Sequence, residues 1–409
     1  MRPEVTSATA QRQRRTHQGK RLDMGNALVH WKSGAGLKLA GLVLGLIIAM
    51  VGCSAPPPPA PLPPPPLPSE PLLPVTHWQA LFDAAAGAAG KQSRRLSRST
   101  DSYDFYNLSY YVDANVSMFE ATGEARYADV ALQLAENMVA SARPSSSIST
   151  SEFQDSYLAW TSQEPDVRGH EVPLFESYAW RYVTRLLRVL RTSPLYADGG
   201  YRDRYQKLLE FTEANIFDKW YSRGADDFIY RSRAHMAAHW AYISLDLAQL
   251  TTDESRRARY REVVDHIDNS LPNYPSSLRA QLRASHTDPM AFWWSDAWGE
   301  MVGPGQDIAH GNGVISYVVE SRDLNAGWTA DELVRFGRTL TSFVLGPEGD
   351  YREYVDGSGR GNGWIADGFV KLGRYDPAVQ AALENYGVQN SQYHAAMALN
   401  AKLLGARGP

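Results

Sequence analysis

The sequence predicts an all-α fold for residues 76–409, an (α/α)6 toroid in which helical hairpins close into a ring. Three observations lead to this prediction. Amphipathic helices recur after short turns, convincing strand patterns are few, and the first and last helices have no hairpin partner other than each other. An open helical solenoid is the alternative architecture.

A repeated pattern marks the outer helices of the ring. Each copy begins with Arg-Tyr and continues with apolar residues at helical spacing. The copies start at Arg126, Arg204 and Arg259, and a longer, more apolar helix precedes each one. Pairing these helices predicts hairpins over 105–142, 173–218, 232–270, 309–345 and 362–387. The helices near 76–89 and 391–404 would form the last hairpin and close the ring.

Residues 1–52 resemble the signal peptide of a bacterial lipoprotein. Leu39–Val51 is an uncharged apolar run that is too short to span a bilayer. It leads directly to Gly52 and Cys53, and Cys53 is the only cysteine of the chain. We therefore expect cleavage before Cys53 and lipidation of its thiol. The polar segment before the apolar run is long, so Met24 is an alternative start.

The residues after the cysteine predict where the protein resides. Ser54 favours the outer membrane, so we expect a lipid-anchored protein of the cell envelope. Residues 53–75 form a proline-rich linker, in which fixed φ angles predict an extended spacer between the lipid and the folded body. The net charge of −4 gives no reason to expect nucleic acid as a partner. We expect the body to act as a monomer.

Polar and aromatic residues gather at the starts of the predicted inner helices. The inner helices of a toroid run parallel, so these clusters should meet at one mouth of the ring. Aromatic faces stack on sugar rings, and amides, imidazoles and guanidinium groups bind hydroxyls and carboxylates. We therefore expect a glycan site at the mouth. Its predicted members are Tyr106, Asn107, Glu176, Tyr178, Trp180, Tyr230, Arg233, His235, His310, Asn312, Asn362 and Trp364.

The segment 290–300 is unusually rich in aromatic residues. Trp293, Trp294 and Trp298 lie between Pro289 and Pro304. A segment of this kind either folds onto the body or lines a cleft, and the cleft is the favoured interpretation. The three tryptophans are accordingly predicted to contact substrate.

Two sequence patterns at the mouth can each be interpreted in more than one way. The Gly-Asn-Gly triplets around Asn312 and Asn362 indicate close backbone approach, or else ordinary helix caps. His235 and His239 have the i, i+4 spacing that two metal ligands on one helix face would have. However, no third ligand and no intervening glutamate are evident. We assign no cofactor and leave a divalent metal open.

On these residues the chain resembles the α/α-toroid carbohydrate-active enzymes, and among them the uronate polysaccharide lyases. This resemblance implies β-elimination on an acidic polysaccharide. It assigns Asn312 and Arg233 to the carboxylate clamp and His310 or His235 to the base. Tyr230 or Tyr178 would be the acid.

Two other functions remain open at this point. A toroid glycoside hydrolase needs two carboxylates around the scissile bond. Glu176, Asp296, Glu300 and Asp307 are available for that role. A non-catalytic glycan-binding lipoprotein of the envelope would show aromatic platforms without an acid–base pair.

Overall fold

The computed structural model describes residues 70–346 and 350–407. The predicted signal peptide, Cys53 and most of the linker lie outside these residues. The chain divides into two units, and all the helices labelled below belong to the unit of residues 55–163 and 167–409. None of the helices described here combines the length and the hydropathy needed to cross a membrane.

The described residues are mainly α-helical. Two small antiparallel hairpins accompany the helices: β1 (Arg143–Pro144) with β2 (Leu158–Ala159), and β3 (Arg283–Ala284) with β4 (Phe292–Trp293). The helices are α2 (Val75–Leu96), α3 (Ser102–Thr122), α4 (Ala125–Ser141), α5 (Pro173–Thr192), α6 (Gly199–Thr212), α7 (Lys219–Phe228), α8 (Ala234–Leu250), α9 (Glu254–Asn269), α10 (Leu278–Gln281), α11 (Ile308–Asp323), α12 (Ala330–Thr339), α13 (Pro377–Glu384) and α14 (Ser391–Arg407).

The inner segments close into a ring. In the order α3, α5, α8, α11, η6 and α14, each inner segment packs on the next, and α14 packs on α3; η6 is a 3-10 helix (Phe369–Arg374). The outer helices α2, α4, α6, α9, α12 and α13 pack against this inner ring. The predicted all-α toroid is therefore confirmed, and the open solenoid is excluded.

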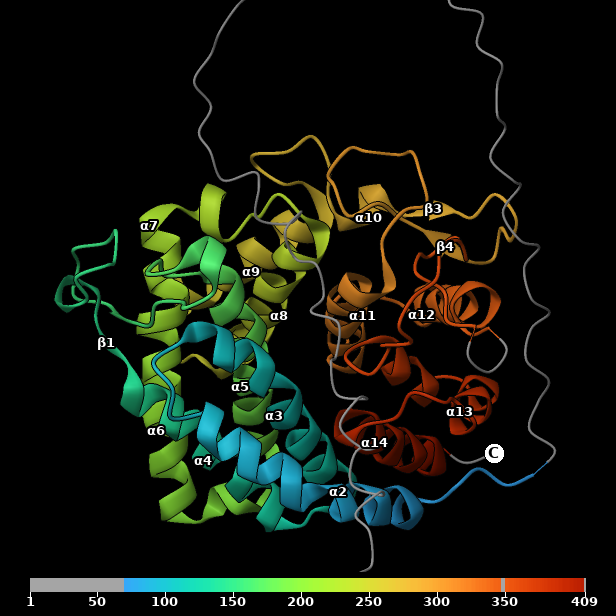
Figure 1. Cartoon of the computed structure of the whole chain (residues 1–409), viewed down its shortest axis with the longest axis horizontal. Coiled ribbons are helices and arrows are strands. Elements are labelled where there is room, and N and C mark those ends of the chain that lie inside the picture. The colour runs from blue at the N-terminus through green and yellow to red at the C-terminus, as the bar shows by residue number, and fades with distance from the viewer. Residues whose placement is uncertain (1–69, 347–349, 408–409) are drawn as a thin grey trace, which may run out of the picture. The chain divides into compact units, whose positions relative to one another are not determined.

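Ring closure depends on the two ends of the folded body. Helix α2 runs beside α14, and Figure 1 shows these helices in blue and red. The ring of Trp78 lies 6.5 Å from the ring of Tyr393 and 6.3 Å from that of His394. Trp78 is 1% exposed, so this contact buries a large apolar side chain. The predicted pairing of the first and last helices is correct.

One predicted inner helix is not an α-helix. The hairpin at 362–387 consists of an irregular segment, the short η6 and α13. Gly363 has a φ of +77°, which ends regular helical structure, and a Cβ on Gly368 would lie 2.2 Å from the carbonyl oxygen of Asn312. Glycine permits this close approach of two backbone segments. An irregular segment therefore stands where the first turns of the helix were expected.

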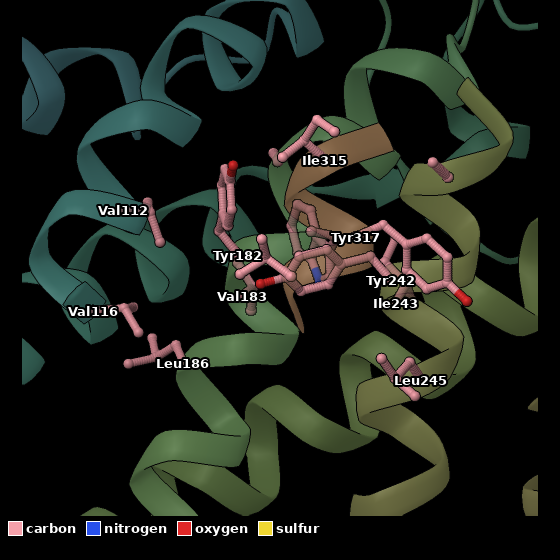
Figure 2. Packing of buried hydrophobic residues seen from close by; sticks show 14 of the residues in the cluster. Val112, Val116, Tyr182, Val183, Leu186, Tyr242, Ile243, Leu245, Ile315 and Tyr317 are labelled. Atoms are coloured by element: carbon pink, nitrogen blue, oxygen red, sulfur yellow. The ribbon is translucent and has the colours of Figure 1, made fainter. Parts of the chain in front are cut away.

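Side chains from several inner helices meet inside the ring. Figure 2 shows Val112, Tyr182, Ile243, Ile315 and other apolar residues facing one another across the inner helices. Apolar burial of this kind contributes roughly 25 cal/mol for each Å² removed from water. The apolar core thus holds the inner helices together and keeps their N-terminal ends in one place.

Ion pairs are buried next to this apolar core. Arg181 lies 2.6 Å from Asp367, and both side chains are at most 1% exposed. Arg185 pairs with Asp113, and Lys371 lies 3.1 Å from the other oxygen of Asp113. Charges buried this deeply need partners, because unpaired they would be strongly unfavourable. We therefore expect the network to determine how the inner helices are aligned.

Candidate functional site

The N-terminal ends of the inner helices converge. The ring of Tyr106 stacks on that of Tyr178 at 4.0 Å, and Tyr178 lies 4.9 Å from His239. Tyr110 lies 4.7 Å from Trp364. The rings of His235 and His310 are 4.5 Å apart. These contacts connect α3, α5, α8, α11 and the segment before η6 at one mouth of the ring, whereas Tyr393 and His394 at the start of α14 pack against Trp78.

Two aspartate–histidine pairs lie at this mouth, and we call them the Asp–His couples. Asp296 Oδ1 lies 2.7 Å from His235 Nδ1, and Asp307 Oδ2 lies 2.9 Å from His310 Nδ1. Arg233 Nε is 3.7 Å from the other oxygen of Asp296. The two imidazole rings face each other between the two carboxylates.

Local structure positions each couple. Asp307 is the N-cap of α11, and its Oδ1 accepts the backbone N–H of His310 at 3.0 Å, three residues further along the chain. Asp296 comes from the loop before α11, and its backbone oxygen accepts the N–H of Ala234 at 2.8 Å. Arg233 forms an isolated bridge with Ala297, which fixes that loop against the start of α8.

The couples are accessible from solvent. The exposed side-chain fractions are 37% for His310, 29% for Asp307 and 20% for Asp296, but only 6% for His235. An ionised carboxylate only accepts hydrogen bonds, so each Nδ1 carries the proton. When a ring is neutral, its Nε2 is therefore the basic nitrogen.

The two histidines have opposite pKa shifts. Burial lowers the pKa of His235 and outweighs the opposing charge of Asp296. Burial also acts on His310, but the hydrogen bond and charge of Asp307 outweigh it and raise the pKa of this imidazole. Burial opposes ionisation of Asp307 as well, yet His310 holds the pKa of that carboxyl at about 2. At neutral pH, His235 is thus the better base and His310 the better acid.

His239 lies behind the couples and is 1% exposed. Burial holds the pKa of this imidazole well below its usual range, so the ring is neutral. Among the described residues, neither of its nitrogens has a hydrogen-bond partner, and a Cβ on Gly313 would lie 2.9 Å from its Nε2. Across the residues that the structure describes, no group of three or more His, Cys, Asp or Glu side chains is arranged to hold a metal.

Asn312 does not have the geometry of a carboxylate clamp. Its side-chain oxygen accepts the backbone N–H groups of Gly368 and Phe369, and its nitrogen donates to the backbone oxygen of Trp364 at 3.0 Å. The residue is fully buried. Its amide is therefore used to join α11 to the segment before η6, and the predicted clamp role is contradicted.

The two tyrosines predicted as acids also have structural partners. The hydroxyl of Tyr230 lies 3.0 Å from Nδ1 of His266 on the outer helix α9. The hydroxyl of Tyr178 donates to Asp367 at 2.9 Å, in the buried ion-pair network. The predicted clamp and tyrosine acid of a lyase are thus not assembled at this mouth.

The predicted substrate-binding residues divide by exposure. Asn107 and Asn362 are exposed, and Tyr106 and Trp364 are partly exposed at the mouth. Trp180 and Glu176 are fully buried. Trp180 donates to Thr212, while Glu176 lies 2.7 Å from Lys219 and accepts from Trp220. Glu176 is therefore a structural ion-pair partner, which also removes it as a hydrolase carboxylate.

The aromatic loop folds onto the body, contrary to our expectation of a cleft lining. Trp293 and Trp298 are each 9% exposed and Trp294 is 1% exposed. Trp294 lies edge-on to Phe336 at 5.4 Å, and Trp298 donates to the backbone oxygen of Arg231. Burial of large apolar surface explains the aromatic content without a ligand.

The sequence reasoning missed three features of this mouth. Tyr110 had no predicted binding role, and Arg231 was not singled out. Asp296 was considered only as a hydrolase carboxylate, because it is 61 residues from His235 and no local pattern connects the two. The Asp307–His310 spacing is a local signal that identifies the other couple.

The comparisons with known proteins give a limited result. No protein-family model matches the sequence. No curated protein matches it either. Among solved structures, the chain is similar to an inactive variant of the α-1,6-mannanase GH76A of Salegentibacter sp. HEL1_6 in complex with α-1,6-mannotriose. This match has 12% identity, covers 79% of this chain and 99% of that one, and has a TM-score of 0.43.

A second structure of the same mannanase is 9% identical in sequence. The match covers 80% of this chain and 99% of that one, with a TM-score of 0.43. These neighbours are glycoside hydrolases and not lyases. The expectation of a uronate lyase is corrected by the structural roles of Asn312 and Tyr230, whose polar groups are bound by the backbone of the segment before η6 and by His266. The solved structures to which this chain is similar are thus α-1,6-mannanases.

Proposed function

We propose that this protein is a glycoside hydrolase whose acid–base chemistry is performed by the two Asp–His couples. The observation that carries the proposal is the contact between two imidazoles with oppositely shifted pKa values, each backed by a carboxylate, at an accessible mouth lined by aromatic rings. Pairs of titratable groups whose environments separate their pKa values are typical of acid–base catalysis.

In the proposed reaction, the glycosidic oxygen departs first and water then attacks the anomeric carbon from the side of the couples, because two rings 4.5 Å apart cannot stand on opposite faces of the sugar. His235 Nε2 takes a proton from that water, and the imidazolium of His310 gives a proton to the departing glycosidic oxygen. The carbon–oxygen bond of the glycoside breaks and a new bond to the water oxygen forms. Asp296 and Asp307 hold the two rings in the required tautomer and stabilise their positive charge, as the carboxylate of a catalytic triad does.

We propose that the substrate is a polysaccharide and that Tyr106 and Trp364 form part of the protein surface that binds it. The partly exposed ring of Trp364 provides a face on which a sugar ring can stack, while Tyr106, stacked on Tyr178 at 4.0 Å, offers the sugar its edge and hydroxyl. Arg233 and the imidazolium of His310 add positive charge, which favours an acidic chain. We propose that the body acts on this substrate as a monomer.

The assay that tests the proposal uses purified protein with neutral and acidic polysaccharides. We expect new reducing ends without new absorbance at about 235 nm, since hydrolysis creates no carbon–carbon double bond. Activity should fall at low pH as His235 gains a proton and at high pH as His310 loses one. Because the rings are in contact, the apparent pKa values belong to the pair. Binding without products would instead favour a glycan-binding protein.

The resemblance of residues 1–53 to a lipoprotein signal supports a proposal about location. We propose that the protein is anchored in the cell envelope through a lipid on Cys53, with the outer membrane as the favoured membrane. Cys53→Ser should move the protein out of the membrane fraction and remove the acyl mass from its N-terminal peptide. Wild-type protein without an acyl chain in mass spectrometry would contradict the proposal.

A further inference from the structure

Arg231 has unusual surroundings for an arginine that is partly buried. Its Nη1 lies 3.5 Å from the backbone oxygen of Asp227, and its Nη2 lies 3.8 Å from the sulfur of Met236. Neither contact is a strong hydrogen bond. Within residues 70–346 and 350–407, no ion pair joins Arg231 to a carboxylate. A guanidinium has five N–H donors, so most donors of Arg231 have no strong acceptor among the described residues.

Other buried arginines of the chain have carboxylate partners. Arg181 pairs with Asp367, Arg185 with Asp113, and Arg374 with Asp323 at 2.7 Å. Burial lowers the pKa of Arg231 to about 10, although Tyr274 and Asp227 oppose this shift. A cation kept partly out of water without a counter-ion costs stability. A cation that lowers stability in this way is a candidate for binding an anionic ligand.

The position of Arg231 places this cation beside the proposed site. It precedes α8, whose first turn carries His235, and its side chain contacts Met236 of the same turn. Its charge also contributes to the lowered pKa of His239. Arg233, two residues further on, is 35% exposed and makes only a long contact with Asp296. The side chain of Arg231 thus lies against the helical turn that carries His235, while Arg233 contacts Asp296 of the couple itself.

We infer that Arg231 binds an anionic substituent of the substrate, a carboxylate, sulfate or phosphate on the sugar next to the couples. This inference rests on the proposed function and makes Arg231 a determinant of substrate specificity. The planar fork of a guanidinium matches any of these three oxyanions with two parallel hydrogen bonds. Binding would supply the counter-ion that the protein itself does not provide.

The test measures binding and needs no turnover. The probes are glucose, glucuronate, glucose 6-sulfate and glucose 6-phosphate, titrated by calorimetry or NMR at constant ionic strength. We expect at least one anionic sugar to bind the wild-type protein about tenfold or more tighter than glucose, since a hydrogen bond to a charged group contributes that much. The anion that binds best identifies the substituent.

Two variants and a control complete the experiment. Arg231→Met should lose most of the preference for the anionic sugar, and Arg231→Lys should keep part of it because lysine retains the charge without the fork. Arg261→Met removes the same charge from an exposed position on α9 and should bind as the wild type does. Equal binding of all four sugars to the wild type would overturn the inference, as would an unchanged preference in Arg231→Met.

The inference and the proposed function can fail separately. Charge-selective binding that depends on Arg231, without hydrolysis of any polysaccharide, would contradict only the proposed hydrolase. Hydrolysis of neutral and acidic chains at equal rates, with no effect of Arg231→Met on KM, would contradict only the anion subsite.

Discussion

His310→Gln should reduce the rate of glycoside hydrolysis by about 100-fold or more, since a positioned general acid typically contributes that much. Glutamine can still donate a hydrogen bond to Asp307, which lies 2.9 Å from the imidazole, but it carries no transferable proton. His310 is 37% exposed, so its replacement should leave the fold unchanged. Initial rates of reducing-end release provide the measurement.

Asp307→Asn tests the same couple through its carboxylate. Asparagine is also a good N-cap, so α11 should still begin at the same residue. The variant should lose activity, and its high-pH limb should move to lower pH, because the carboxylate that raises the pKa of His310 is gone. His286→Gln, an exposed histidine of the loop before α11, is the matched control and should behave as the wild type. Equal activity in all three variants would remove the Asp307–His310 couple from the mechanism.

Arg181→Met should lower the free energy of unfolding by about 3–5 kcal/mol, the usual effect of removing one partner of a buried ion pair. The guanidinium lies 2.6 Å from Asp367, and the two side chains are 0% and 1% exposed. It also stacks on the rings of Tyr178 and Tyr182. Methionine fills a similar length but leaves Asp367 without this partner. Denaturant unfolding measures the loss.

Arg204→Met is the control for this stability effect. Arg204 pairs with Glu136 at 2.6 Å on the outer helices, where the two side chains are 29% and 31% exposed. Partly exposed ion pairs contribute about 1 kcal/mol or less. If Arg181→Met were no more destabilising than Arg204→Met, the buried network would not determine how the inner helices are aligned.

Asn312 and the tryptophan loop show where prediction from sequence failed. The Gly-Asn-Gly pattern left close backbone approach and helix capping open at Asn312, and the close backbone contact comes from Gly368, outside the triplet. The partners of its amide are backbone groups more than 50 residues away, at separations of 52 and 56 residues, which no local pattern reveals. Trp294 raised the same difficulty, since aromatic density is equally typical of a core and of a sugar-binding surface.

The sequence by itself determined the ring of helices and the end of the ring at which polar residues gather. Helical periodicity and short turns are local properties, so the hairpins and the pairing of the chain ends followed from them. Asp307 and His310 also lie within one helical turn, and their contact depends only on the start of α11.

Only the tertiary structure decided which side chains at the mouth are available for chemistry. His235 obtains its carboxylate from Asp296, a residue of a distant loop, and Glu176 is taken into an ion pair with Lys219 of α7. Arg231 could be identified only from the structure, because no carboxylate of the described residues lies within ion-pair distance of its guanidinium. Hydrogen-bond partners and burial depend on long-range packing, and they determine whether a polar residue supports the fold or remains free to bind and react.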